Sequence, residues 1–120
     1  MTKARAGALV DRVRSALSGT PRVVEKRMFG GTLFMVRGRM CVSAGAGRIM
    51  CRIDPDRHDA AVKRKGCRTV VMGGRAYRGF VHVDAAVLGR KQALADWVRL
   101  ALDYNRKAGS GRKKKRTARP

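Results

Sequence analysis

The sequence has few aromatic residues, few acids and almost no histidine. Six aromatic side chains (three Phe, two Tyr, one Trp) and two His occur in 120 residues, of which 44% are hydrophobic. The core must therefore be built mainly from aliphatic side chains, Met and Ala. The eight acids are scattered along the chain. No Ser-His-Asp or paired-carboxylate pattern appears, so the sequence predicts a protein without enzymatic activity.

Cysteine is also scarce, and its spacing does not match a metal motif. The three cysteines are Cys41, Cys51 and Cys67, with no CxxC pair, so we expect neither a metal nor a cofactor. An odd number of cysteines without a secretory signal is typical of a reducing compartment, which predicts a cytoplasmic protein with reduced thiols. No apolar run reaches the ~18 residues of a membrane span, so no membrane partner is expected.

Positive charge is the most pronounced property of the chain. Lys and Arg number 29 against eight acids, a net charge of +21. Such a chain attracts polyanions, which predicts a nucleic-acid partner contacted through its phosphates and a place at the nucleoid. A role in solubility alone is the alternative. The predicted phosphate-binding residues are the cations of the last nine positions: Arg112, Lys113, Lys114, Lys115, Arg116 and Arg119.

Hydrophobic periodicity and turn signals predict three helices and up to six strands. Apolar residues at helical spacing predict helices over 4–18 and 91–106. Asp54 followed by Pro55 favours the start of another helix, which stops near Gly66. Connections between the first four predicted strands are short, which forces antiparallel pairing of neighbours. The predicted strands are residues 23–28, 32–36, 39–44, 48–53, 68–72 and 77–83.

This order of elements predicts the fold class. One helix, four strands, a helix, two strands and a last helix indicate an α+β fold, with two layers and an antiparallel five- to six-stranded sheet packed by helices. We expect this domain to occupy residues 1–108. Gly109-Ser110-Gly111 is typical of a linker, and residues 109–120 are predicted to form a disordered basic tail.

The two faces of the predicted sheet differ in character. A hairpin centred on Ala46 places Cys41 opposite Cys51, within disulfide reach, although small buried thiols are the commoner case. In that register one face carries Phe34 and Ile49, and we assign the helices to it; the reverse assignment is the alternative. The other face is then an apolar, Met-rich interface for a protein partner or a second copy of the chain, formed by Leu33, Met35, Arg37, Met40, Val42, Met50 and Arg52.

Three segments carry a resemblance to a known family. They are Lys26-Arg27-Met28-Phe29-Gly30-Gly31 with the following Phe34-Met35, then Gly79-Phe80-Val81-His82-Val83, and a closing helix with Trp97, which its spacing predicts to be buried. In this order they resemble the TfoX/Sxy N-terminal domain over roughly residues 8–106. The resemblance implies a two-layer antiparallel sheet packed by helices, no enzymatic activity, and a role around the regulation of natural competence genes. Longer members carry a second, helical C-terminal domain, whereas this chain has only the basic tail.

Charge and resemblance together lead to two functional hypotheses. The first is a regulatory or accessory protein of this family that binds nucleic acid electrostatically. The alternative is a protein-interaction or dimerisation module with no physiological nucleic-acid ligand.

Overall fold

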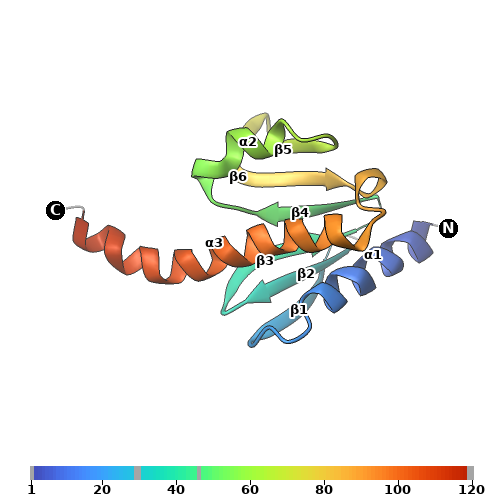
Figure 1. The fold of residues 1–120 in the computed structure, drawn as a ribbon, viewed down its shortest axis with the longest axis horizontal. Helices are drawn as coiled ribbons and strands as arrows, with labels where there is room; N and C mark the ends of the chain where they lie inside the picture. The colour runs from blue at the N-terminus through green and yellow to red at the C-terminus, as the bar shows by residue number, and fades with distance from the viewer. Residues whose placement is uncertain (1, 29–30, 46, 119–120) are drawn as a thin grey trace.

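The helices and strands follow the predicted order along the chain (Figure 1). The computed structural model describes residues 2–28, 31–45 and 47–118, with side chains for residues 8–27, 31–45 and 47–108. Short 3-10 turns lie at Pro55–Arg57 (η1) and Ala85–Val87 (η2). The helices and strands are α1 (Thr2–Ala16), β1 (Val23–Met28), β2 (Gly31–Val36), β3 (Arg39–Ala44), β4 (Arg48–Arg52), α2 (His58–Val62), β5 (Cys67–Met72), β6 (Arg75–Asp84) and α3 (Lys91–Ala118).

The six strands form one antiparallel sheet in the order β1-β2-β3-β4-β6-β5. The first four strands are joined by short connections and each pairs with its neighbour in the sequence. After β4, η1 and α2 carry the chain to the far edge of the sheet, where β5 begins. β6 then returns between β5 and β4 and pairs with both. The predicted α+β fold with an antiparallel sheet is therefore confirmed, with six strands.

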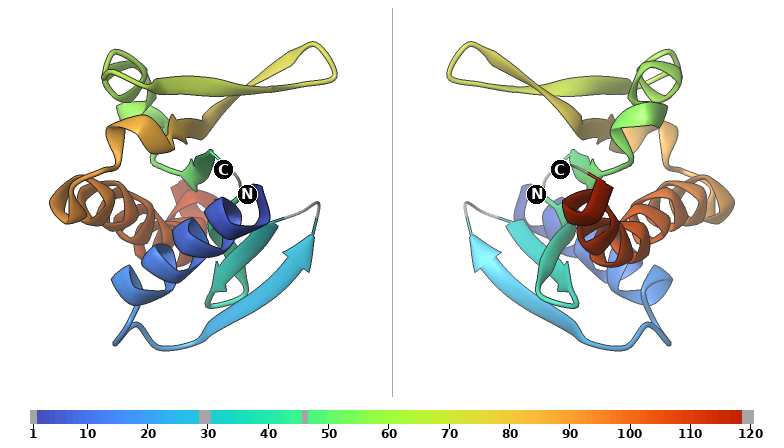
Figure 2. Two further views of the ribbon diagram at one scale, coloured as in Figure 1. Left: turned by 90° about the vertical axis from the view of Figure 1, so that its right-hand side faces the viewer. Right: turned by 90° about the vertical axis from the view of Figure 1, so that its left-hand side faces the viewer.

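The helices lie together on one face of the sheet, which gives the fold two layers (Figure 2). One core cluster joins Val13 of α1, Trp97 of α3 and Ala61 of α2 to Phe34 and Ile49 of the sheet. Trp97 is 2% exposed and Phe34 is 0% exposed. The assignment of the helices to the face that carries Phe34 and Ile49 is thus confirmed. We call the opposite side, which no described helix covers, the open face.

The β5–β6 hairpin extends beyond the rest of the sheet. β6 begins at Arg75, two residues before its predicted start, but it pairs with β4 only from Phe80 onward. Its first residues therefore pair with β5 alone. Gly73 and Gly74 close the hairpin with φ of 58° and 76°, the left-handed conformation that a tight hairpin turn requires. The resulting arm projects on the side of the sheet away from α1 and α3 (Figure 2).

A β-bulge changes the register that the sequence predicted for β3. Phe34 pairs with Val42 and Met35 pairs with Met40, which leaves Cys41 without a partner on β2. Cys51 lies opposite Val42, so the predicted opposition of Cys41 and Cys51 is wrong. Because the extra residue interrupts the alternation of side chains, both Cys41 and Val42 point into the core and are 0% exposed. Val42 is therefore not part of the open face.

The last helix continues further than predicted. α3 runs from Lys91 to Ala118, whereas we predicted an end at residue 106 and a disordered tail from 109. The Gly109-Ser110-Gly111 segment thus lies inside the helix. Each glycine costs about 1 kcal/mol in a helix, but Lys, Arg and Ala are good helix formers and the packed first half of α3 already supplies the helical nucleus. Side chains beyond Ala108, and residue Arg119 altogether, lie outside the described part of the chain.

Candidate functional surface on the open face of the sheet

A row of side chains crosses the open face from one edge of the sheet to the other. Leu33 of β2 lies opposite Ser43 of β3, and Met50 of β4 is paired with Ser43 on one side and His82 of β6 on the other. Cations stand at both ends of the row: Lys26 on the edge strand β1 and Arg68 on the edge strand β5. The middle of this row therefore alternates the apolar Leu33 and Met50 with the polar Ser43 and His82, and its edges are basic.

The predicted interface residues occupy this face with one exception. Leu33, Met35, Met40 and Met50 are half-buried, and Val24 beside Met35 is 53% exposed. Arg52 ends β4 on the same side, since it follows the core residue Cys51. Arg37 is exposed in the β2–β3 turn with a φ of 54°. Ser43 takes the place that the sequence prediction gave to Val42.

An aromatic cluster, which the sequence prediction missed, lies where β4 ends, between the open face and α3. The guanidinium of Arg52 is 5.4 Å from the ring centre of Phe80 and 5.5 Å from that of Tyr104 on α3. The ring of Tyr77 meets that of Phe80 edge to face, with 6.4 Å between their centres. Tyr77 is 36% exposed. We call Arg52, Tyr77, Phe80 and Tyr104 the aromatic–arginine cluster.

Gly79 brings the rings of this cluster together. Three residues of β6 lie between the pairs Thr69–Val81 and Val70–Tyr77, where the ladder with β5 shifts its register. Gly79 sits in this irregular segment with a φ of 92°, and a Cβ atom there would stand 3.2 Å from the carbonyl oxygen of Ile53. Only glycine fits such a position without strain. The signal available in the sequence is a glycine between two aromatic residues in a predicted strand, which favours a bulge there but does not indicate its partners.

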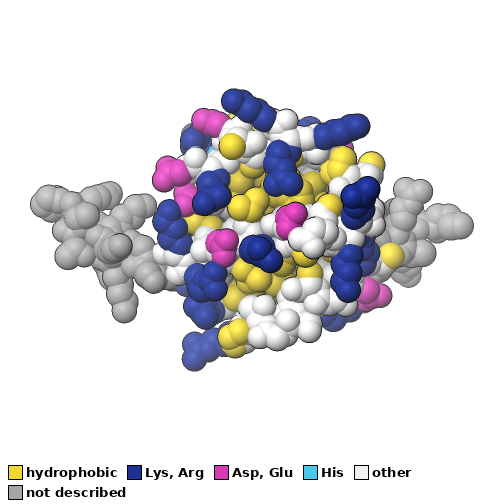
Figure 3. Space-filling view, in the orientation of Figure 1, with side chains coloured by type: hydrophobic (Ala, Val, Ile, Leu, Met, Phe, Trp, Pro, Cys, Tyr) yellow, Lys and Arg dark blue, Asp and Glu magenta, His cyan; other side chains and the backbone are white. Residues whose placement is uncertain are grey.

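Charge is distributed unequally between the two sides of the sheet. On the open face the sole acid of the described side chains is Asp84, which accepts two hydrogen bonds from Arg68 at 2.9 and 3.0 Å. That ion pair lowers the pKa of Asp84. The remaining acids lie on the helices, in the loops around them, or, as Glu25, in an ion pair with Arg14 of α1. Figure 3 shows the helical face, where Asp and Glu side chains are interspersed with Lys and Arg.

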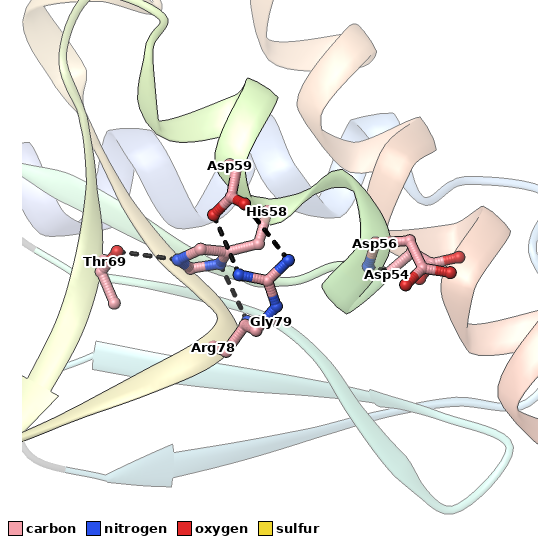
Figure 4. Close-up of polar contacts among 7 residues, drawn as sticks. All are labelled: Asp54, Asp56, His58, Asp59, Thr69, Arg78 and Gly79. Atoms are coloured by element: carbon pink, nitrogen blue, oxygen red, sulfur yellow. Dashed lines mark hydrogen bonds and ion pairs between the residues drawn. The ribbon is translucent and has the colours of Figure 1, made fainter.

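His58 occupies a buried junction of α2, β5 and β6 (Figure 4). Its Nδ1 accepts a hydrogen bond of 2.9 Å from the backbone N–H of Gly79. That acceptor role requires an unprotonated Nδ1, so Nε2 carries the proton and donates to Thr69 Oγ1 at 2.8 Å. Burial, together with the charge of Arg78, lowers the pKa of His58. Both nitrogens are thus engaged within the fold, and the neutral ring holds the Gly79 bulge in place.

His82 is the histidine that faces the open side. It is half-buried between Met50 on β4 and Arg68 on β5. Burial and the charges of Arg48 and Arg68 lower its pKa. His82 therefore adds a neutral, planar ring to the surface near neutral pH.

The three cysteines belong to the core. Cys41, Cys51 and Cys67 are buried and carry free thiols. Burial raises the pKa of Cys41 to about 12 and also raises the pKa of Cys51 and Cys67. A thiol needs its thiolate form to react or to bind a metal. Among the described residues, no group of three or more His, Cys, Asp or Glu side chains is placed to hold a metal ion.

The remaining predicted sites are placed only in part. Lys26 and Arg27 of the family motif are exposed on β1, and Gly31 packs against the carbonyl of Ala44, where a Cβ atom would come within 2.5 Å. The side chain of Met28, and residues Phe29 and Gly30, lie outside the described part. The backbone of the tail positions Arg112, Lys113, Lys114, Lys115 and Arg116 is helical within α3. Within the described residues, no helix is long and apolar enough to cross a membrane.

Comparisons with known proteins identify relatives of the whole domain. The family model described as the TfoX N-terminal domain matches residues 15–104. The crystal structure of Deinococcus radiodurans protein DR2400, whose family-model domain is DUF419, superposes with a TM-score of 0.66 at 18% sequence identity. That match covers 86% of this chain and 80% of the other, and at such low identity it shows a shared fold only. No curated protein matches the chain.

Proposed function

The chain belongs to the TfoX N-terminal domain family, and on that premise we propose that it is a regulatory or accessory protein, without enzymatic activity, that binds nucleic acid by electrostatic contacts. The family resemblance supports the regulatory part, with competence genes as its target. The charge supports the nucleic-acid part. A protein of this kind works in the cytoplasm, at the nucleoid.

The observation that carries the proposal is how few of the cations are neutralised within the fold. Among the described side chains, six of the eight acids form ion pairs, and these pairs use five cations, because Arg14 serves both Asp11 and Glu25. Most Lys and Arg of the described part therefore have no carboxylate partner there. Unneutralised cations on a folded surface release counterions from a phosphate backbone when they bind it, which favours association.

The shape of the molecule adds a second basic element to the body. α3 continues past the sheet and carries the backbone of positions 112–116, five consecutive cations, away from the core (Figure 1). Phosphate contacts of this kind position a protein on nucleic acid but do not read its sequence. We therefore propose that the affinity of the body and the extension is independent of sequence.

The test is the salt dependence of binding to a labelled duplex DNA. About six phosphate contacts predict a log–log slope near −5 and a loss of affinity of about 10³-fold between ~50 and ~200 mM salt. A full-length variant with glutamine at the six tail cations should bind more weakly and show a flatter slope. As a control, Asp56→Asn changes the net charge by one unit at an exposed acid that holds no ion pair among the described side chains, and it should leave the slope unchanged.

Two results would contradict the proposal. One is an affinity that does not change with salt. The other is a dissociation constant weaker than ~10⁻⁴ M at low salt, which falls outside even the non-specific range. Either result would favour the alternative, a protein-interaction module with no nucleic-acid ligand.

A further inference from the structure

We infer that the open face of the sheet is a platform for single-stranded nucleic acid, where bases stack on the aromatic–arginine cluster and flanking cations hold the phosphates. This inference rests on the proposed function. It adds the kind of strand that is bound and the surface that contacts its bases.

The first argument is charge complementarity confined to this face. Lys26, Arg48 and Arg52 stand on the open face without an ion pair among the described side chains, and the one acid there, Asp84, is already neutralised by Arg68. Acids on the helical side are interspersed with the cations (Figure 3). A polyanion therefore meets less repulsion on the open face than on the helical face.

The second argument is the concentration of flat side chains. Phe80 and Tyr104 flank the guanidinium of Arg52, and Tyr77 packs edge to face on Phe80, so three of the six aromatic residues belong to this cluster. His82 adds a further planar ring two residues from Phe80 on the same strand. Aromatic and guanidinium planes are the groups on which unpaired bases stack, with little preference for base type. Tyr77 is 36% exposed, so its ring is accessible to a base.

The third argument is the shape of the surface. A DNA groove admits a helix or a two-stranded ribbon, whereas this face presents six strands, about 24 Å across at ~4.8 Å per strand gap. A duplex would also keep its bases stacked inside, out of reach of the rings. A single strand lying across the sheet can place its bases on the cluster while its phosphates meet the unpaired cations of the face, Lys26 on the edge strand β1 and Arg48 on β4.

The alternative occupant of the face is a protein that packs on its Leu and Met side chains, such as Leu33, Met40 and Met50. A second copy of the chain would bring its own Lys26, Arg48 and Arg52 against the same cations, at a net charge of +21 on each chain. Such repulsion is strongest at low salt. A dimer would therefore strengthen as salt rises, whereas nucleic-acid binding weakens. This opposite sign allows one titration to separate the two occupants.

The experiment compares a labelled 12-nucleotide oligo(dT) with a 12-base-pair duplex by fluorescence anisotropy on the full chain. Tyr77→Leu keeps an apolar side chain at this exposed position but removes the stacking ring. We expect the affinity for oligo(dT) to fall by about 5- to 150-fold, which is the range for the loss of one stacked base. Duplex affinity should change by less than about twofold. Arg52→Lys keeps the charge but removes the planar guanidinium. It should therefore also weaken the binding of oligo(dT) more than the binding of the duplex.

The matched control is Arg99→Lys, the same replacement at an exposed arginine of α3 on the helical side, which should leave both affinities unchanged. Thermal melting of each variant checks that the fold is retained.

If both nucleic acids bind but Tyr77→Leu and Arg52→Lys leave oligo(dT) affinity intact, the inference is wrong and the proposed function stands. If neither nucleic acid binds at low salt, the proposed function fails as well. A dimer seen by light scattering that strengthens with salt and is abolished by Met50→Asp would assign the face to a second copy and overturn the inference.

Discussion

At the scale of single residues, His58 determines how the protein responds to acid. Its neutral ring bridges the Gly79 N–H and the Thr69 hydroxyl, and its pKa is lowered by burial first and by Arg78 second. Protonation would destroy the acceptor at Nδ1 and place a second positive charge beside Arg78. The unfolded chain, with a His pKa of about 6.5, therefore binds the proton more readily than the native state does.

We predict from this that the free energy of unfolding is at its full value above pH ~6.5 and falls as the pH is lowered toward 5. Unfolded chains bind more protons than native ones in this range, so stability must rise with pH there. The measurement is urea denaturation at several pH values. His82 also has a lowered pKa and contributes in the same direction, so His58→Gln should reduce the slope without abolishing it. An unchanged slope in His58→Gln would show that His58 does not titrate in this way.

At the scale of elements, the β5–β6 hairpin depends on one glycine. Gly79 has a φ of 92°, and a Cβ atom there would lie 3.2 Å from the Ile53 carbonyl oxygen and 3.3 Å from Pro55 Cγ. The same residue donates its N–H to His58. Backbone conformation, close packing and a buried hydrogen bond thus coincide at one position where the hairpin leaves the body of the sheet.

We predict that Gly79→Ala lowers the free energy of unfolding by about 1–3 kcal/mol, the cost of a left-handed conformation plus local displacement. Gly73→Ala is the matched control, because Gly73 also has a positive φ, of 58°, but nothing lies within 4 Å of its added Cβ. The control should cost about 1 kcal/mol or less. Chemical denaturation of both variants gives the comparison. Equal losses in the two variants would mean that the contacts with Ile53 and Pro55 are easily relieved.

At the scale of the whole molecule, self-repulsion dominates the electrostatics. The ion pairs join mostly exposed side chains, and pairs of this kind stabilise by about 0–1 kcal/mol each. Against them stands a net charge of +21 on a molecule that spans 52 × 31 × 28 Å. Salt screens both effects, but the repulsion involves many more charges than the pairs do.

We predict that the melting temperature rises when NaCl is increased from about 20 to about 300 mM. An increase of ~1 kcal/mol in the free energy of unfolding raises the melting temperature by roughly 4 °C in a domain of this size. The full-length variant with glutamine at the six tail cations has a net charge of +15 instead of +21 and should gain less. Differential scanning calorimetry measures both. A melting temperature that falls with salt would show that the ion pairs outweigh the repulsion.

Local patterns were sufficient to predict the order of the elements and the antiparallel sheet. A period of two marks most of the strands, a period near 3.6 marks α1 and α3, and short turns join the strands of each hairpin. The burial of Trp97 and of Phe34 follows from the same spacing. These features depend on residues that are close in the sequence, and for that reason the sequence alone determined them.

The register and the composition of the open face were decided by tertiary structure. The bulge at Cys41 moved Val42 into the core and Ser43 onto the open face, because one extra residue reverses the facing of those that follow it. The aromatic–arginine cluster joins β4, β6 and α3, and the ion pairs that use up most of the acids join residues as distant as Asp54 and Lys107. Such contacts form only when the chain has packed, since each depends on the geometry of segments that are remote in the sequence.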